Sequence, residues 1–383
     1  MQPLNMDLER ITEFFEGNFL SFGELGASLC ITRNNEELVN LAGGYCDRKK
    51  STPWTRKTPV LIWSATKGLA AACLVHATWT HRIPFDQKVA NLWPEYGSGG
   101  KADTTLLHVL AHQAGQPALR DPAISILDHE AVAAQLARQR PLWKPGAAHG
   151  YHARTYGFLL DELVRRITQG VPLGTYFQKV FGEPLELDLW IGIPDWAAAR
   201  VAPIFAPRKA RESGDAEDAF YEALSQPDSL TRKAFMTPSG LNSSFQMNDP
   251  SVRRHSLPSL GGIGTAESLA RFYALLCSNQ LFPFETLNRI GKLQCTGLDQ
   301  VLRVDTAFGI GFMKDPVVSA GKTRSIFGPS PSAFGQPGSG GSLGFCDPEH
   351  GVAFAYVMNQ MEPGLFPNTK ALRIIKHFYD VCL

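Results

Sequence analysis

The two ends of this 383-residue chain carry the same pattern, a pair of strand-like runs next to an amphipathic helical run. The segments are a helical pattern at 7–19, strand-like runs at 26–33, 37–45, 342–347 and 351–359, and a helical pattern at 368–383. Each strand pair is joined by three polar or turn-forming residues, as is typical of a β-hairpin. The pattern predicts one antiparallel sheet, built from both chain ends and flanked by helices.

The middle of the chain is predicted to be mainly helical. Apolar residues recur at helical spacing from Tyr156 to Ile167, and Gly170 ends that pattern. A second helix is expected after Thr265, whose side chain is a suitable N-cap. We therefore expect an α+β fold in a single domain, 1–383. Its α/β lobe would comprise about 1–80 and 290–383, and its mainly helical lobe about 81–289.

Charge and cysteine content exclude several classes of protein. Lys plus Arg number 37 against 36 Asp plus Glu, so no net field favours nucleic acid or an anionic membrane as partner. The longest apolar run, at 69–75, is too short to cross a bilayer. The seven cysteines are scattered without a C-x-x-C pair, which argues against disulfides and zinc sites. We expect a cytoplasmic protein without metal or cofactor.

A serine and a lysine three residues apart, Ser64 and Lys67, head an Ala/Leu-rich helical run. Side chains at this spacing share a helix face, with Cβ atoms about 5–6 Å apart. The helix dipole and apolar neighbours disfavour a charged ammonium, and a neutral lysine can serve as base for serine. The alternative is an N-cap serine with a solvated lysine. Two further Ser-x-x-Lys matches, Ser98–Lys101 and Ser319–Lys322, contain glycine and are interpreted as loops.

Two other segments carry candidate chemistry. Tyr151 lies in a polar loop directly before the strongest amphipathic helix, where its phenol could relay a proton. The glycine-dense segment 334–345 leads into a strand, and its amides could act as oxyanion donors. Each has a structural alternative, a packed aromatic residue in the first case and a bulged edge strand in the second.

Three patterns are interpreted as coincidental. Ser342 lies in a G-x-S-x-G match, but a strand follows it where a nucleophile elbow requires a helix. His108 and His112 have metal-ligand spacing without the glutamate of the H-E-x-x-H motif, so packing or capping is expected of them. The segment LGGIG at 260–264 lacks a P-loop lysine and is expected to be a turn.

Taken together, these segments resemble the serine β-lactamase and penicillin-binding-protein superfamily, in particular its class C-like branch and the carboxylesterases with a β-lactamase fold. PVLIWSATKGLAAACLV resembles the first motif and its helix, and PGAAHGYHARTYGFLLDELVRRITQG resembles the tyrosine motif. TTLLHVLAHQAGQPAL, SLGGIGTAESLARF and PGSGGSLGFCDPEHGVAFAYVMNQM are similar to other segments of that family. The resemblance covers nearly the whole chain and implies the β-lactamase/transpeptidase-like fold.

The resemblance also implies roles for individual residues. Ser64 would be the nucleophile, Lys67 and Tyr151 the proton-transfer pair, and the backbone amides of Ser64 and Ser339 the oxyanion donors. The implied substrate-binding residues are Gln336, Gly338 and His152.

Two departures from the class C pattern concern the substrate. Tyr151 is followed by His152-Ala153 where those enzymes have Tyr-x-Asn, and Gln336-Pro337-Gly338 replaces Lys-Thr-Gly. The chain therefore lacks the cation that would hold a substrate carboxylate.

We expect a serine hydrolase that cleaves small carboxylic esters through an acyl-enzyme on Ser64. The alternatives are a β-lactamase or D-alanyl-D-alanine peptidase, an acyltransferase, or a non-catalytic binding protein on the same scaffold.

Overall fold

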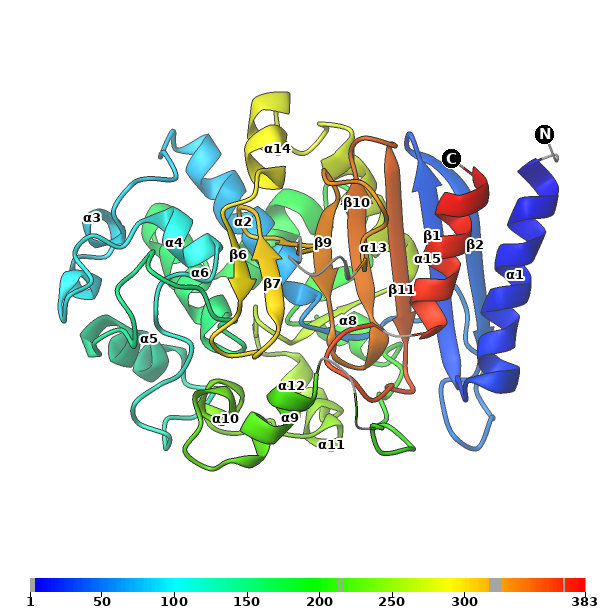
Figure 1. The fold of residues 1–383 in the computed structure, drawn as a ribbon, viewed down its shortest axis with the longest axis horizontal. Coiled ribbons are helices and arrows are strands. Elements are labelled where there is room, and N and C mark those ends of the chain that lie inside the picture. The colour runs from blue at the N-terminus through cyan, green and yellow to red at the C-terminus, as the bar shows by residue number, and fades with distance from the viewer. Residues whose placement is uncertain (1–3, 213, 215–216, 317–324, 368, 383) are drawn as a thin grey trace.

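The computed structural model describes residues 4–212, 214, 217–316, 325–367 and 369–382, and Figure 1 shows their fold. The strands are β1 (Gly26–Arg33), β2 (Glu36–Gly44), β3 (Val60–Trp63), β4 (Leu189–Ile191), β5 (Gly262–Gly264), β6 (Cys295–Leu298), β7 (Asp305–Phe308), β8 (Met313–Lys314), β9 (Phe334–Pro337), β10 (Leu343–Asp347) and β11 (Val352–Met358). The helices are α1 (Leu4–Ser21), α2 (Thr66–Thr80), α3 (Val89–Leu92), α4 (Leu106–Leu110), α5 (His129–Arg138), α6 (Thr155–Ile167), α7 (Leu173–Phe177), α8 (Asp195–Ala198), α9 (Asp218–Ser225), α10 (Leu230–Met236), α11 (Ser244–Met247), α12 (Pro250–Arg253), α13 (Ala266–Cys277), α14 (Phe284–Gly291) and α15 (Thr369–Cys382). Short 3₁₀ turns occur at η1 (Pro94–Gly97) and η3 (Ser339–Gly341), and a π turn at η2 (Gln178–Gly182).

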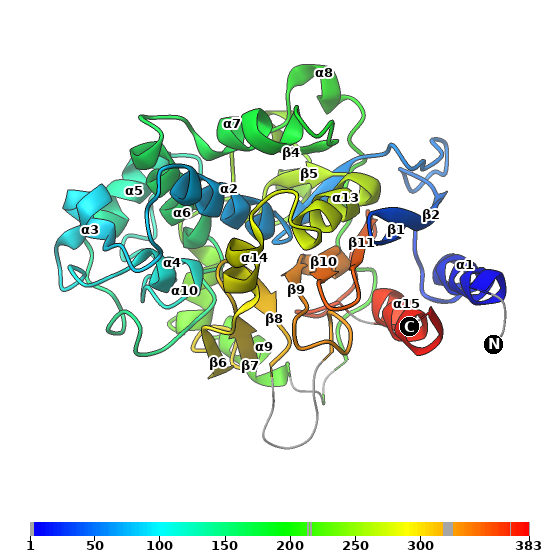
Figure 2. The same cartoon turned by 90° about the horizontal axis from the view of Figure 1, so that it is seen from above.

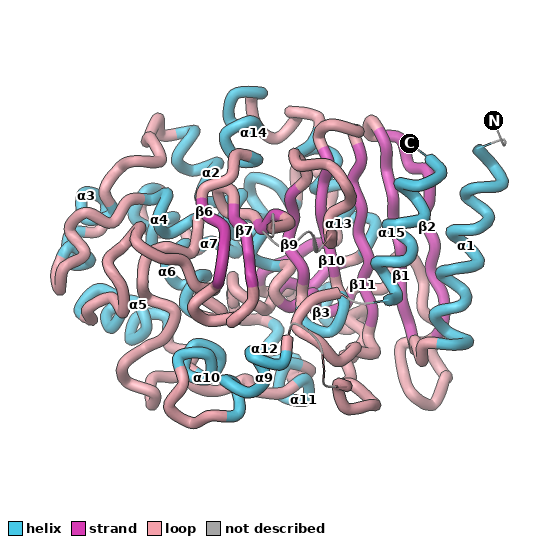
Figure 3. The backbone as a smooth tube through the Cα atoms, viewed as in Figure 1, coloured by secondary structure: helices cyan, strands magenta, loops and turns pink. Residues whose placement is uncertain are grey.

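The large sheet is built from the two ends of the chain, as expected. Its order is β2-β1-β11-β10-β9-β8-β7-β6, and every described pairing in it is antiparallel. The N-terminal hairpin turns at Asn34 and Asn35, whose φ values of 52° and 66° suit a tight two-residue connection. The strand β1 pairs with β11, which joins the N-terminal hairpin to the C-terminal one (Figure 3).

Helices cover both faces of this sheet because its strands alternate between two apolar faces. Phe354 and Tyr356 belong to the core beneath α1 and α15, whereas Ala353 and Ala355 belong to the core beneath α13. Figure 2 shows α13 on one side of the sheet and α1 and α15 on the other. The sheet is thus the middle layer of an α/β/α arrangement. The small alanines let α13 approach closely.

The division into lobes at about 81 and 290 stays a prediction, and α13 is the element that bears on it. This helix lies within 81–289, yet it packs on β1, β10 and β11 of the large sheet. Thr265 caps it as expected, its side chain accepting a hydrogen bond from the Ser268 amide.

A second, three-stranded sheet with order β3-β5-β4 was not expected from the sequence. The expectation of a turn at 260–264 was wrong, because residues 262–264 form the central strand β5. Glycine is needed there because a Cβ at Gly262 would collide with the side chain of Thr66, and one at Gly264 with that of Leu189. This sheet holds the end of β3 against the first turn of α2.

The central helix α2 is buried on nearly all sides and contacts α6 and α7. Gly68, in its first turn, allows the helix to approach α13, because a Cβ there would collide with the Tyr273 hydroxyl. None of the helices in the described part of the chain has the length and apolar character that a membrane crossing requires.

Candidate active site

Ser64 lies at the junction between strand β3 and helix α2. The strand ends at Trp63, which has a left-handed φ of 48°, and α2 begins at Thr66. A non-glycine residue in this region is strained and is held there only by surrounding structure. Ala65 occupies the N-cap position, so Ser64 is not the capping serine of the alternative interpretation.

Lys67 is fully buried behind the serine. Its Nζ lies 3.2 Å from Ser64 Oγ, 2.8 Å from the Ala153 carbonyl oxygen and 2.7 Å from the Ser259 carbonyl oxygen. Burial holds the pKa of Lys67 well below its usual value, and the nearby Arg154 guanidinium lowers it further. None of the three hydrogen-bond partners carries a negative charge that would oppose these two effects.

Tyr151 lies against the same pair of side chains. The Lys67 Nζ lies 4.7 Å from the centre of the Tyr151 ring, and Gln336 Nε2 donates to the phenol oxygen over 3.3 Å. Burial raises the pKa of Tyr151, and a hydrogen bond with Ser64 opposes the shift. The structure therefore brings Ser64, Lys67, Tyr151 and Gln336 together, although they come from distant parts of the chain.

Asp299 positions Tyr151 and was missed by sequence reasoning. Both of its carboxylate oxygens lie 3.0 Å from the Tyr151 amide nitrogen. The carboxylate also accepts hydrogen bonds from the Val301 and Leu302 amides and from the Thr306 hydroxyl. Burial raises the pKa of Asp299, and the amide donors oppose that shift. A single aspartate in this mixed polar and apolar stretch carries no recognisable motif, so the sequence offered no signal for it.

Ser339 and Gly338 lie in the turn between β9 and β10. Ser339 starts the turn η3, which depends on a left-handed φ of 83° at Gly340. Gly338 is buried, and a Cβ there would collide with the Ile62 carbonyl oxygen of β3. Gly338 thus holds this turn close to the strand that carries Ser64. Gly338 is not among the residues that line the two cavities at Ser64, which are described below. Its predicted contact with the substrate therefore stays a prediction.

His152 is placed elsewhere than expected. Only 1% of this residue is exposed, and its Nε2 accepts a hydrogen bond from the Gln116 amide over 3.0 Å. Its Nδ1 lies 2.6 Å from the Gly150 carbonyl oxygen, and burial lowers its pKa to about 4. His152 is therefore neutral, and its hydrogen bond with the Gln116 amide links the loop that contains Tyr151 to the segment that contains Gln116. It lines neither of the cavities at Ser64.

The patterns interpreted as coincidental have structural roles. Ser342 is fully buried and donates to the Ile62 carbonyl oxygen over 2.9 Å. His108 takes part in a capping box with Thr105, and His112 stacks on Tyr156 at 4.3 Å between ring centres. In the described part of the chain, no three His, Cys, Asp or Glu side chains are grouped as a metal ion requires.

One of the other two Ser-x-x-Lys matches, Ser98–Lys101, differs from the first. Lys101 Nζ donates to three carbonyl oxygens, one of them that of Ser98, rather than to a serine hydroxyl. Ser319 and Lys322 lie outside the described residues.

Two cavities meet at Ser64. One, which we call the aromatic cavity, measures about 240 Å³ and is lined among others by Tyr151, Phe220, Tyr221, Phe235, Gln336 and Phe366. The other, which we call the wide cavity, measures about 420 Å³ and is lined among others by Trp63, Ala206, Met236, Leu241, Leu260 and Met361. Ser64, Ser339, Leu224 and Phe235 line both. The contribution of α9 and α10 was missed, because the charged stretch before α9 carries no sign of a binding site.

Arg154 lines the wide cavity but is engaged by protein groups. Its guanidinium donates to the Pro238 and Gly240 carbonyl oxygens over 2.8 and 2.6 Å. It also donates to Asn242 Oδ1 over 2.6 Å. Burial lowers the pKa of Arg154 to about 10, so the group stays cationic at neutral pH.

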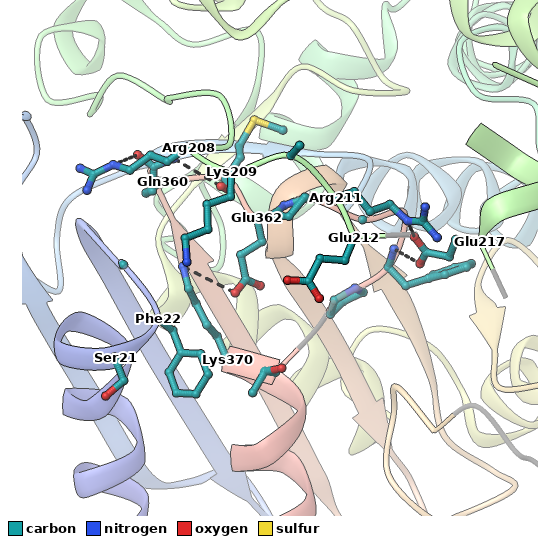
Figure 4. A pocket seen from close by; sticks show the side chains of 18 residues that line it. Ser21, Phe22, Arg208, Lys209, Arg211, Glu212, Glu217, Gln360, Glu362 and Lys370 are labelled. Atoms are coloured by element: carbon teal, nitrogen blue, oxygen red, sulfur yellow. Dashed lines mark hydrogen bonds and ion pairs between the residues drawn. The ribbon is translucent and has the colours of Figure 1, made fainter. Parts of the chain in front are cut away.

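A larger cavity of about 780 Å³ adjoins these two, between the end of α1, the start of α15 and residues 208–212 and 217. It shares Met361 with the wide cavity and Gly364 and Phe366 with the aromatic cavity. Figure 4 shows its charged lining, which includes Arg208, Lys209, Glu212, Glu362 and Lys370. It contains none of the candidate catalytic residues.

The chain is similar to proteins of known family and structure. A family model described as Beta-lactamase matches residues 15–377. The chain is 29% identical over 348 residues to Esterase/beta-lactamase LipL of Mycobacterium tuberculosis, with 88% of this chain and 77% of that protein covered. A penicillin-binding-protein homologue from Caulobacter crescentus is 34% identical, with a TM-score of 0.84 and 98% and 97% of the two chains covered.

A family VIII carboxylesterase is 29% identical, with a TM-score of 0.85 and 98% of each chain covered. EstA from Arthrobacter nitroguajacolicus Rue61a is 27% identical, with a TM-score of 0.84 and 98% and 96% covered. The expected β-lactamase/transpeptidase-like fold is thereby confirmed. The chain belongs to the beta-lactamase family.

Proposed function

We propose that this protein is a serine carboxylesterase that cleaves small carboxylic esters through an acyl-enzyme on Ser64. Lys67 and Tyr151 act as the proton-transfer pair. The family membership, the relative named an esterase/beta-lactamase and the structural neighbour named a carboxylesterase support an enzyme of the β-lactamase-like carboxylesterase type. The residue roles rest on the geometry of this chain.

The observation that carries the proposal is the environment of the Lys67 amine. A neutral amine has two N–H donors and one lone pair. The Ala153 and Ser259 carbonyl oxygens take the two donors, and the third partner is the Ser64 hydroxyl. The lone pair then faces Ser64 Oγ, where a base must be to remove its proton. Burial and the Arg154 charge favour this neutral form.

The reaction then follows in two steps. Ser64 Oγ attacks the ester carbonyl carbon as its proton passes to Lys67 Nζ. The carbon–alkoxy bond breaks, and the proton reaches the leaving alkoxide through the Tyr151 phenol. A water molecule next attacks the acyl-enzyme and gives up a proton to the same pair, and Ser64 leaves as the hydroxyl. The amides of Ser64 and Ser339 would donate to the carbonyl oxygen as it becomes negative.

The lining of the site favours a neutral substrate. Gln336 occupies the position beside Tyr151 and donates to it without a charge. The Arg154 guanidinium is already bonded to carbonyl oxygens and to Asn242. A β-lactam or a D-alanyl peptide brings a carboxylate that would have to leave water without a cationic partner, which is costly. β-Lactam hydrolysis is therefore the second candidate function. It is retained because the name of the mycobacterial relative includes beta-lactamase.

A fluorophosphonate probe tests the nucleophile. It should label one tryptic peptide, TPVLIWSATK from Thr58 to Lys67, and the label should disappear in Ser64→Ala. The matched control is Ser342→Ala, which removes the serine of the G-x-S-x-G match and should keep the label. Labelling that survives in Ser64→Ala and vanishes in Ser342→Ala would overturn the proposal.

The proton-transfer pair is tested by combining substitutions. Lys67→Ala and Tyr151→Phe should each lower kcat strongly, and the double variant should be little slower than either, because residues that act as a unit are not additive. Losses that multiply would show that one of the two residues only packs.

A further inference from the structure

The two cavities at Ser64 are separated by a wall of two side chains. Leu224 of α9 and Phe235 of α10 line both cavities, whereas the remaining lining residues, apart from Ser64 and Ser339, belong to only one. An ester carbonyl bonded to Ser64 carries two groups, the acyl chain and the alkoxy group. A site with two arms can hold these groups apart, one on each side of the wall.

The position of the proton donor decides which group enters which cavity. Tyr151 and Gln336 line the aromatic cavity and do not line the wide cavity. When the carbonyl oxygen points to the Ser64 and Ser339 amides, the leaving oxygen must face the phenol that protonates it. The alkoxy group then extends into the aromatic cavity, and the acyl chain extends past Trp63 into the wide cavity.

The lining of each cavity describes the group that it can hold. Phe220, Tyr221 and Phe366 contribute aromatic surface to the 240 Å³ cavity. A closed apolar cavity of about 150 Å³ is enough to bind benzene. The aromatic cavity can therefore hold one substituted ring. The 420 Å³ of the wide cavity, lined by Met236, Leu241 and Leu260, suit a flexible aliphatic chain.

We propose that the substrates are neutral esters of an aromatic or bulky alcohol with an aliphatic acid, and that Leu224 and Phe235 keep the alcohol in the aromatic cavity and the acyl chain in the wide cavity. This proposal rests on the proposed function, because it assigns the two groups by their position relative to Ser64 and Tyr151.

Two filling variants test the assignment. Leu365→Trp narrows the aromatic cavity, and Ala206→Trp narrows the wide cavity. Leu365 is only half-buried and Ala206 is exposed, so both variants should fold. A control, Leu127→Trp, adds the same ring at a residue that is 42% exposed and outside both cavities.

The measurement is a ratio of kcat/KM within two series of esters. One series keeps a butyryl group and compares 1-naphthyl with ethyl as the alcohol, and the other keeps p-nitrophenol and compares octanoyl with acetyl. Leu365→Trp should lower the naphthyl/ethyl ratio at least about tenfold and leave the octanoyl/acetyl ratio within about threefold. Ala206→Trp should do the reverse, and Leu127→Trp should change neither ratio.

Phe235→Ala removes part of the wall and should weaken both preferences at once. The assignment is overturned if Leu365→Trp discriminates by acyl chain and Ala206→Trp by alcohol, or if each variant changes both ratios alike. Mass spectrometry of Ser64-labelled peptide separates this failure from failure of the proposed function. An acyl mass on Ser64 with reversed ratios would overturn only the assignment, whereas no acyl mass from any ester would overturn the acyl-enzyme itself.

Discussion

The proposed chemistry of this site depends on one buried lysine without a carboxylate among its hydrogen-bond partners. Lys67 Nζ meets two carbonyl oxygens and a hydroxyl, each at 3.2 Å or less. Because burial lowers its pKa, the amine can be neutral at a pH where an exposed lysine would be charged. The same residue in water would be a poor base for serine.

The pH dependence of kcat/KM should report this lysine. In the proposed mechanism the neutral amine is the active form, so activity should fall as pH drops through the lowered pKa of Lys67 and Nζ becomes protonated. Lys67→Arg keeps a long cationic side chain that does not deprotonate and should lose several orders of magnitude in kcat/KM at every pH. Activity in Lys67→Arg close to that of wild type would show that the lysine is not the base.

A second residue-scale prediction concerns Gln336. The hydrogen bond of a cation to a substrate carboxylate is worth about 1.5–3 kcal/mol. Without that cation, p-nitrophenyl butyrate should be cleaved at least about tenfold more efficiently than nitrocefin. Gln336→Lys should narrow this ratio by improving nitrocefin more than the ester. Gln280→Lys adds the same charge at an exposed position and should leave the ratio unchanged. Equal efficiency on both substrates in wild type would contradict the prediction.

At the scale of elements, the site is held together by loops that join distant segments. The Asp299 carboxylate accepts hydrogen bonds from the Tyr151, Val301 and Leu302 amides. One buried side chain therefore connects the loop before α6 to the loop before β7. The Lys67 amine similarly joins α2 to the backbone before α6 and before β5. The secondary-structure elements alone would leave these groups free to separate.

Replacing Asp299 should therefore cost stability. Asp299→Ala leaves several buried amides without an acceptor, and each unsatisfied donor costs about 1–3 kcal/mol. The free energy of unfolding, measured in urea, should fall by at least about 2 kcal/mol. The control is Asp103→Ala, whose side chain is 86% exposed and which should leave the free energy of unfolding almost unchanged. Equal effects of the two substitutions would show that Asp299 is not needed to hold the loop.

At the scale of the whole molecule, a buried charge network links the two ends of the chain. Lys370 Nζ of α15 lies 3.0 Å from Glu24 Oε2, and the Tyr356 hydroxyl donates to the same oxygen over 2.7 Å. Asn18 of α1 donates to that hydroxyl. Lys370 also reaches Glu362 at 3.6 Å, at the edge of the charged cavity in Figure 4. Glu24 lies just before β1 and Tyr356 lies in β11, so this network lies where the N-terminal hairpin joins the rest of the sheet.

Breaking this network should destabilise the protein as a whole. Lys370→Ala leaves Glu24 buried without its cation, and removing one partner of a buried ion pair costs about 3–5 kcal/mol. Lys376→Ala, on the same helix, removes a lysine whose side chain is 76% exposed and whose pair with Asp380 is a surface contact. That control should cost less than about 1 kcal/mol. Unfolding in urea measures both, and similar values for the two variants would contradict a structural role for the network.

The sequence by itself determined the features that depend on neighbours within a few residues. The hairpins at both ends, the Thr265 cap and the spacing of Ser64 and Lys67 follow from periodicity, turn chemistry and the helical repeat. The tertiary structure alone decided which distant groups meet. The carbonyl groups that accept hydrogen bonds from Lys67 lie 86 and 192 residues away in the sequence, and the Tyr151 amide that donates to Asp299 lies 148 residues away. Residues 260–264 were expected to form a turn, but residues 262–264 form the strand β5, because they pair with β3 on one side and β4 on the other. Local patterns set backbone preference, but burial, pKa and the shape of the two cavities arise only when packing removes water between segments far apart in the chain.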